Sequence, residues 1–187
     1  WQSLMNFCSN CGSPTSQRIP LGDNRNRDVC IKCDAIFYQN PKIIAGCVPT
    51  FNNKVLLCKR AIEPRSGFWT LPAGFMENHE TCLGAALRES EEEANTHIKN
   101  PTLYGIFDLP HISQVYIFYQ GEVIDGLFSP GIESLEVELF KENDIPWKNL
   151  AFPVIDIMLQ HHFKKTKHAD ICTATINKSW INNLSSK

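Results

Sequence analysis

The chain has 187 residues, of which 43% are hydrophobic and 20% charged, and its formal net charge is −2. These values provide enough apolar side chains for a buried core and argue against wholesale disorder. They also argue against a protein that mainly coats nucleic acid or an anionic membrane, and no apolar run approaches the roughly 20 residues that span a bilayer. We therefore expect a soluble protein with one ordinary domain and a small appendage.

Residues 1–4 precede Met5, and we interpret them as a remnant upstream of the native start. With Met5 as the start, no room remains for a signal or transit peptide. The expected location is then the cytoplasm, whereas an organelle is the alternative if the native start lies further upstream. Residues 1–4 are left out of the expected fold.

Two tight cysteine pairs lie near the N-terminus, Cys8 with Cys11 and Cys30 with Cys33. Each Cys-x-x-Cys pair can place two thiolates on one turn, and two such turns complete a tetrahedron around Zn²⁺. The alternatives are two disulfides or four buried thiols. We predict a zinc ribbon over residues 5–40, and a structural role for the metal, because four thiolates leave no open position for a substrate.

The charge of this ribbon bears on its partner. Its basic residues exceed its acidic ones by a single charge, which is a poor electrostatic footprint for a phosphate backbone. We therefore expect nucleic acid to be an unlikely partner, and consider docking or dimerisation at least as suitable a role. The charged residues counted are Arg18, Arg25, Arg27, Lys32, Asp23, Asp28 and Asp34.

A second domain of strands and helices is predicted over residues 41–165, followed by a polar C-terminal tail, 166–187. Its expected strands are 43–51, 54–60, 69–73, 102–108, 114–123 and 136–140, with one more at 171–176 in the tail. Asn52-Asn53 predicts a hairpin turn. Helices are expected over 80–93, with Asn78 as the N-cap, and over 152–164. Because strands and helices do not alternate strictly, the pattern favours an α+β fold, in the form of an α/β/α sandwich.

The first predicted helix is unusually acidic. Glu89, Glu92 and Glu93 are three and four residues apart and therefore share one helical face. Carboxylates this close repel one another and raise one another's pKa values, a cost that a bound Mg²⁺ or Mn²⁺ removes. An acidic run alone is more often a solvated helix face. The helix by itself therefore does not decide between a metal site and a solvated surface.

The residues around this helix carry a longer pattern. GFMENHETCLGAALRESEEEANT, residues 74–96, resembles the Nudix box: Gly, five residues, Glu, seven residues, Arg-Glu, an aliphatic residue, any residue and Glu-Glu. The first Gly and every charged position match. Ser90, Asn95 and Thr96 stand where the family has an aliphatic residue, Gly and another aliphatic residue. Asn tolerates the left-handed cap conformation that Gly supplies, so we expect the departures to affect packing rather than chemistry.

The resemblance implies a Nudix fold and specific roles for the matched residues. In that family one to three Mg²⁺ or Mn²⁺ ions would be held by the three glutamates and by the backbone carbonyl of Ala73. Arg88 would pair with Glu80 and orient the helix. One more catalytic and metal-binding carboxylate would come from a later loop, where Glu133 and Glu136 are the candidates and Glu136 is preferred. The three glutamates that would hold the ions are Glu89, Glu92 and Glu93.

Beyond the box, the chain resembles the zinc-ribbon Nudix hydrolases related to the plant FAD and ADP-ribose pyrophosphatases. The similar stretches are QNPK at 39–42, LLCKRAIEPRSGFWTLPAGFME at 56–77 and SPGIESLEVELF at 129–140. Lys59 and Arg60 are candidates to meet phosphates, with ordinary surface charge as the alternative. Trp69 is a candidate to stack on a ring. Further stacking candidates, with core packing as the commoner role of such residues, are Phe68, Phe107, Tyr116 and Phe118.

The implied reaction is metal-dependent hydrolysis of a nucleoside diphosphate derivative. FAD, giving FMN and AMP, is the first choice, and ADP-ribose, giving ribose 5-phosphate and AMP, is the second. NADH is a poorer choice, because the sequence contains no stretch of the form SQPWPFPxS that marks the NADH pyrophosphatases. The rival reading is a nucleotide-sensing regulator or nucleic-acid-binding protein that uses a Nudix fold and a ribbon. We expect a homodimer.

Overall fold

The computed structural model describes residues 5–164 and 171–177. The chain divides into two compact units, and the division falls between Pro41 and Lys42. The predicted tail, 166–187, lies outside the described residues except for 171–177, and residues 1–4 lie outside them as well.

The N-terminal unit is a small three-stranded antiparallel sheet in the order β1-β2-β3. The strands are β1 (Thr15–Arg18), β2 (Arg27–Cys30) and β3 (Ile36–Phe37). Its buried apolar residues among those described are Cys8, Val29 and Cys30. Three small side chains do not make a core that could stabilise such a unit. The stability of this sheet therefore has to come from another source.

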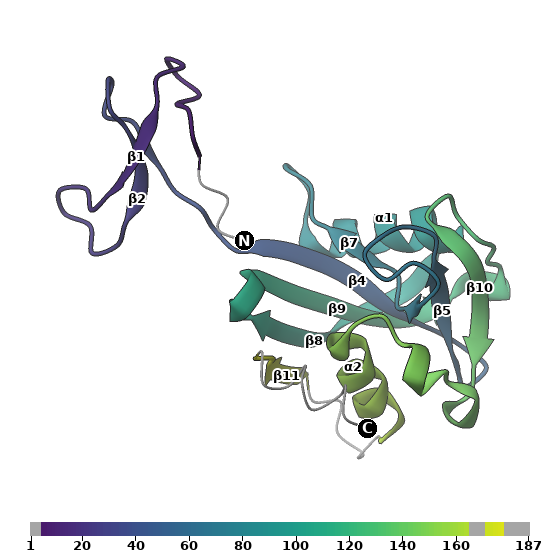
Figure 1. Cartoon of the computed structure of the whole chain (residues 1–187). Coiled ribbons are helices and arrows are strands. Elements are labelled where there is room, and N and C mark those ends of the chain that lie inside the picture. The colour runs from purple at the N-terminus through teal and green to yellow at the C-terminus, as the bar shows by residue number, and fades with distance from the viewer. Residues whose placement is uncertain (1–4, 165–170, 178–187) are drawn as a thin grey trace. The chain divides into compact units, whose positions relative to one another are not determined.

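The larger unit is built on one mixed sheet in the order β10-β5-β4-β9-β8-β11, with β6 paired to β5 and β7 paired to β4 (Figure 1). The β4–β9 and β8–β11 pairs are parallel, and the other pairs are antiparallel. The strands are β4 (Lys42–Phe51), β5 (Lys54–Arg60), β6 (Trp69–Thr70), β7 (Ala73–Phe75), β8 (Ile98–Leu109), β9 (Gln114–Val123), β10 (Ser134–Phe140) and β11 (Cys172–Thr175).

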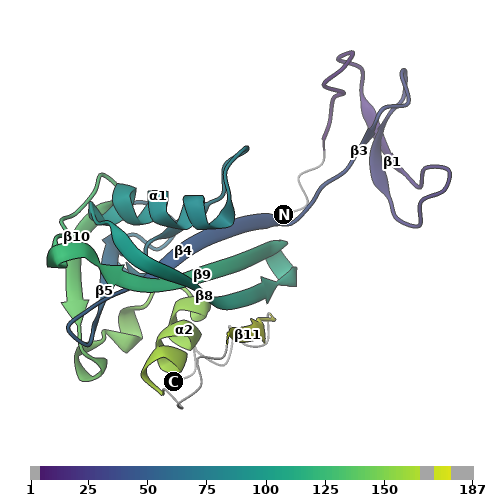
Figure 2. The same ribbon diagram turned by 180° about the vertical axis from the view of Figure 1, so that it is seen from behind.

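Two helices cover opposite faces of this sheet, α1 (Cys82–Ala94) and α2 (Pro153–Phe163) (Figures 1 and 2). Ala85 and Ala86 of α1 pack in one buried cluster, and Ile155 and Met158 of α2 pack in another. This arrangement confirms the predicted α/β/α sandwich. Short 3₁₀ helices occupy four connections: Pro110–Ile112, Ile124–Gly126, Glu142–Asp144 and Trp147–Asn149. Neither helix of the described chain has the length and apolar composition needed to cross a bilayer.

Several predicted boundaries change in the structure. The N-cap of α1 is Thr81 and not Asn78: the Thr81 hydroxyl accepts a hydrogen bond from the Gly84 amide at 2.9 Å, and the helix begins at Cys82. The single strand predicted over 69–73 is two strands, β6 and β7. Pro72 lies between them, and a proline has no N–H group to donate to a ladder. The turn at 52–53 is confirmed, since both asparagines have positive φ.

Candidate active site

The three glutamates of α1 have different environments. Glu89 and Glu93 lie four residues apart on the side of the helix that faces the sheet, and both are buried. Glu92 lies on the outer side, where its side chain is 57% exposed. A Cβ atom added to Gly74 of β7 would lie 2.4 Å from the Glu89 carboxylate. Glycine at this position therefore allows the carboxylate to rest against the strand.

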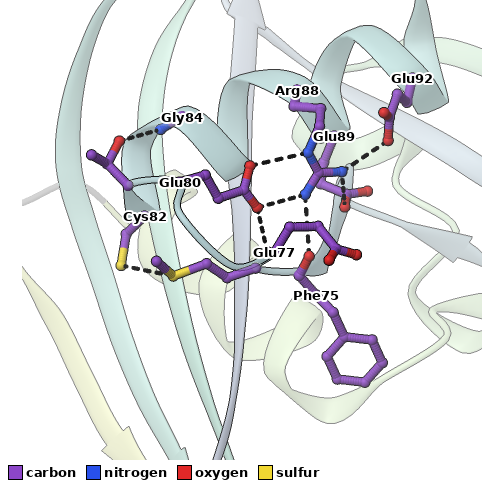
Figure 3. A network of polar contacts seen from close by, with 10 residues as sticks. Phe75, Glu77, Glu80, Cys82, Gly84, Arg88, Glu89 and Glu92 are labelled. Atoms are coloured by element: carbon purple, nitrogen blue, oxygen red, sulfur yellow. Dashed lines mark hydrogen bonds and ion pairs between the residues drawn. The ribbon is translucent and has the colours of Figure 1, made fainter.

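Arg88 links the helix to the loop that precedes it (Figure 3). Its Nη2 lies 2.9 Å from Glu80 Oε1 and donates to the Phe75 carbonyl at 3.1 Å. Its Nη1 donates to Glu89 at 2.7 Å and to Glu92 at 2.9 Å. The hydrogen bond from Arg88 lowers the pKa of Glu80, and the hydrogen bond to Glu80 raises the pKa of the guanidinium. The pairing of Arg88 with Glu80 matches the one that the Nudix resemblance implies.

Glu93 is buried, and nearby positive charge offsets the charge of its carboxylate only in part. Its pKa is raised to about 8, mainly by burial and then by the charge of Glu89, against the lowering effect of the Arg60 charge and of a backbone hydrogen bond from Ala73. Burial also raises the pKa of Glu89. Within the described residues, Glu93 Oε2 is buried without a hydrogen-bond partner. Two buried carboxylates with an unpartnered oxygen beside a backbone strand fit a hard divalent cation, which prefers oxygen ligands.

The raised pKa of Glu93 predicts a pH dependence of stability in protein stripped of divalent cations. Between the usual value of 4.5 and about 8, the folded state holds a proton on Glu93 that the unfolded state has released. Through this residue the free energy of unfolding should fall by about 1.4 kcal/mol per pH unit across this window as the pH rises. We expect urea melts in chelator to show a fall of at least this slope, and Glu93→Gln to reduce it to the part that the raised pKa of Glu89 contributes. Saturating Mn²⁺ should restore stability at pH 8, since a cation that binds only the folded state stabilises it.

A later glutamate adds charge to this site. The charge of Glu133 raises the pKa values of both Glu89 and Glu93. Glu136, the residue that the sequence favoured, instead forms an ion pair with Lys59, with 2.7 Å between Nζ and Oε1. In this structure Glu133 thus acts on the buried pair through its charge, whereas Glu136 is paired with Lys59.

The two basic residues predicted to contact phosphate, Lys59 and Arg60, have different surroundings. Lys59 is engaged by Glu136, and its Nζ lies 5.8 Å from the centroid of the Trp69 ring. Trp69 itself is 8% exposed and packs edge-on against Phe140, so little of its ring is available to a ligand. Arg60 carries the charge that lowers the pKa of Glu93. Of the predicted substrate-contacting residues, Arg60 is therefore the one that the structure links to the carboxylates.

The aromatic candidates are mostly core residues. Phe107 and Phe118 are completely buried, which agrees with core packing, the commoner of the two roles considered for them. Tyr116 is partly buried beside them, and its pKa is raised by burial. Phe68 lies under Arg65, with 5.2 Å from the guanidinium to the ring centroid. The sequence analysis missed Phe152, whose ring lies 5.2 Å from the Arg60 guanidinium, because nothing in a helix-starting Phe-Pro pair indicates such a contact.

The four ribbon cysteines gather at one point, with their Sγ atoms all within 4.8 Å of one another. The separation is 3.6 Å for Cys8–Cys33, 3.5 Å for Cys11–Cys30 and 3.6 Å for Cys11–Cys33. A tetrahedral Zn²⁺ with Zn–S bonds of about 2.3 Å requires sulfur separations of about 3.8 Å. All four cysteines are free thiols, so the disulfide alternative fails. The amides of Lys32 and Cys33 lie within 3.4 Å of Cys30 Sγ, where they can stabilise a thiolate.

The sandwich, its glutamate-bearing helix and the four-cysteine ribbon together define a hydrolase domain of the Nudix fold class. Residues 40–160 match the family described as the NUDIX domain, and residues 6–39 match the family described as Nudix N-terminal, a zinc ribbon. The chain therefore belongs to the Nudix hydrolase family and is an enzyme.

Similar proteins include a solved Nudix hydrolase from Nitrosomonas europaea, with 52% identity and a TM-score of 0.88 over 93% of this chain and 100% of that chain. An ADP-ribose pyrophosphatase from Methanocaldococcus jannaschii is 34% identical over 62% of this chain and 69% of its own length. An NAD-capped RNA hydrolase, NudC, from Vibrio parahaemolyticus is 28% identical over 78% of this chain. The chain spans about half of that protein, 54% of its length.

Proposed function

We propose that this enzyme hydrolyses the diphosphate bond of a nucleoside diphosphate derivative, with ADP-ribose as the first candidate and FAD as the second. The observation that carries the proposal is the buried pair Glu89 and Glu93, with raised pKa values and an unpartnered oxygen on Glu93. A cation site is the arrangement that offsets the cost of burying these two charges.

In this reaction, different residues of the chain would bind the cation, accept a proton and contact phosphate. Mg²⁺ or Mn²⁺ would be held by Glu89, Glu92 and Glu93, helped by the Ala73 carbonyl; once bound, it neutralises the diphosphate and lowers the pKa of a bound water. Glu133, whose charge acts on the buried pair, would accept the proton from the attacking water. Two cations, Arg60 and Arg88, have separate roles: Arg60 can meet a phosphate, and Arg88 holds the carboxylates in place.

The substrate order rests on different observations. ADP-ribose is placed first because the 34% identical relative is an ADP-ribose pyrophosphatase. FAD is retained because the ribbon and the flanking motifs resemble the plant-type enzymes. NAD derivatives come third, because the NudC relatives act on NAD-capped RNA but the sequence has no SQPWPFPxS stretch.

A substrate panel tests the proposal. We expect ADP-ribose, FAD, NADH and diadenosine polyphosphates, assayed with Mg²⁺ and with Mn²⁺, to include at least one dinucleotide that releases AMP. For the best substrate, Glu92→Gln should lower kcat/KM at least about a hundredfold, because a charge that holds the catalytic cation is lost. Glu91→Gln is the matched control: Glu91 is an exposed neighbour at the position where the box pattern accepts any residue, so its variant should stay within about twofold.

The rival class, a nucleotide-sensing regulator, makes the opposite prediction. A sensor would bind DNA tightly and specifically in an electrophoretic shift assay at physiological salt and would turn over no dinucleotide. The intact set of Glu89, Glu92 and Glu93 favours the enzyme, because binding a nucleotide does not require all three carboxylates.

We also propose an organisation for the whole chain. The zinc ribbon comprises residues 5–40 and the catalytic domain residues 41–165, and the chain forms a homodimer. The small excess of positive charge in the ribbon gives it little attraction for nucleic acid, which favours a protein partner. Light scattering coupled to size-exclusion chromatography would give a mass near twice that of one chain, and a monomer mass would reject this part of the proposal.

A further inference from the structure

The connection between β9 and β10 lies against the C-terminal turn of α1 (Figure 2). The Ser129 amide donates to the Ala94 carbonyl at 2.9 Å, and the Gly131 amide donates to the Glu93 carbonyl at 3.0 Å. The last carbonyls of a helix have no partner within it, so these amides satisfy groups that would otherwise be left open. The loop and the helix end are therefore one hydrogen-bonded assembly.

Asn95 adds a contact that the family pattern does not provide. It caps α1 in the left-handed conformation, with φ 45° and ψ 42°, and its amide donates to the Glu91 carbonyl. Its side-chain Nδ2 lies 3.3 Å from the Ser129 carbonyl and 3.0 Å from the Pro130 carbonyl. The glycine expected here by the Nudix pattern would supply the same backbone conformation but no side chain to hold the loop.

The same loop carries Glu133. A Cβ atom added to Gly131 would lie 1.7 Å from the Glu92 carbonyl, so the loop approaches the helix as closely as a glycine permits. Two residues later, the Glu133 carbonyl accepts a hydrogen bond from the Ala61 amide at 2.8 Å. The segment is thus held by its backbone at the helix end, where Gly131 contacts Glu92 and Glu93, and again beside β5 at Glu133 itself.

We propose that Asn95 is a positioning residue, which ties the Ser129–Glu133 loop to the catalytic helix and so keeps Glu133 close to Glu89 and Glu93. Like charges repel one another, and a free loop would relieve the repulsion by moving Glu133 away from the helix. The two hydrogen bonds from the Asn95 side-chain Nδ2 to the loop carbonyls oppose that movement. The inference rests on the proposed function, because Glu133 matters only if the carboxylates serve a cation and a reaction.

The variant Asn95→Gly tests this role, since it keeps the left-handed cap and removes only the side-chain tie. We expect Mn²⁺ to bind about tenfold more weakly, measured from free Mn²⁺ by electron paramagnetic resonance. The value of kcat should also fall about tenfold, with KM within about twofold, because small displacements of a catalytic group reduce the rate steeply. A carboxylate at this position attracts the cation whether or not it is a direct ligand, so both readouts should move together.

Thr96→Val is the matched control. The Thr96 hydroxyl donates to the Leu127 carbonyl at 2.9 Å, so this variant also removes one tie between the helix end and the same connection, but further from Glu133. It should lower the melting temperature while leaving Mn²⁺ affinity and kcat within about twofold. A double-mutant cycle adds a second test: in a Glu133→Gln background, Asn95→Gly should change both quantities less than about twofold.

Two results would overturn the proposal. One is an Asn95→Gly protein that melts earlier but binds Mn²⁺ and turns over substrate like the wild type, which would make Asn95 a helix cap alone. The other is full additivity with Glu133→Gln. If the wild type hydrolyses no dinucleotide while the Mn²⁺ measurements show the coupling, the positioning role stands and the proposed reaction fails.

Discussion

Glu93→Gln should lower kcat/KM for the best dinucleotide by about a thousandfold, the largest kinetic effect expected for any single change in this enzyme. Glu93 differs from its neighbour Glu92 in its surroundings. It is buried, its pKa is raised to about 8, and its Oε2 has no hydrogen-bond partner among the described residues. Glutamine preserves the shape but offers a neutral amide, which is a poor ligand for Mg²⁺ or Mn²⁺. Steady-state assays of AMP release with each metal measure the loss.

The control for Glu93→Gln is its own stability. In chelator at pH 8, where the wild-type carboxylate is partly ionised and buried, the variant should be at least as stable as the wild type. Urea melts would show that the loss of activity does not come from unfolding. Activity within tenfold of the wild type would contradict the placement of Glu93 in the cation site, and a variant that melts earlier would contradict the unneutralised state of this acid.

Cys30→Ser should remove zinc from the protein and unfold the ribbon, the largest structural effect that we expect. The N-terminal unit has only Cys8, Val29 and Cys30 as buried apolar residues among those described, so its folding energy must come mostly from the metal. Zinc content, measured by atomic absorption, should fall from about one ion per chain to almost none. Limited trypsin digestion should then cleave at Arg18 and Lys32 while the larger unit stays intact.

Cys82→Ser is the matched control for the ribbon variant. Cys82 is a half-exposed thiol at the start of α1, outside the ribbon cluster. Its variant should keep the zinc and the protease resistance of the wild type. Zinc retained by Cys30→Ser, or a ribbon that resists trypsin without it, would show that the four thiolates do not hold a structural ion.

The parts of the fold that the sequence predicted are those fixed by local chemistry. The Asn52-Asn53 turn and the limits of β9 follow from turn residues and from a run of β-formers between polar breaks. The α1 helix was predicted because its alanines and glutamates repeat on two faces. Its first residue was misplaced, because Asn78 and Thr81 are both good N-caps and only packing decides which one ends the loop.

The parts of the site that the sequence left open depend on contacts between distant segments. Glu133 and Glu136 are three residues apart, and a bulge in the pairing of β10 with β5, between Ser134 and Glu136, alters the register of this segment. A bulge of this kind is not specified by residue types alone. The sequence allows Phe107 and Phe118 either to stack on a base or to pack in the core. Only the packing of α2 on the sheet shows that both rings belong to the core.

The parallel pairing of β11 with β8 has a consequence for how the protein behaves in concentrated solution. Four residues, Cys172–Thr175, cover Gly105–Asp108 on the outermost long strand, and His111 Nδ1 lies 3.1 Å from the Ile176 carbonyl. An uncovered strand edge offers unpaired amides and carbonyls to any passing chain and so seeds aggregation. Because a short edge strand leaves few unpaired backbone groups, we expect β11 to reduce self-association through this edge of the sheet.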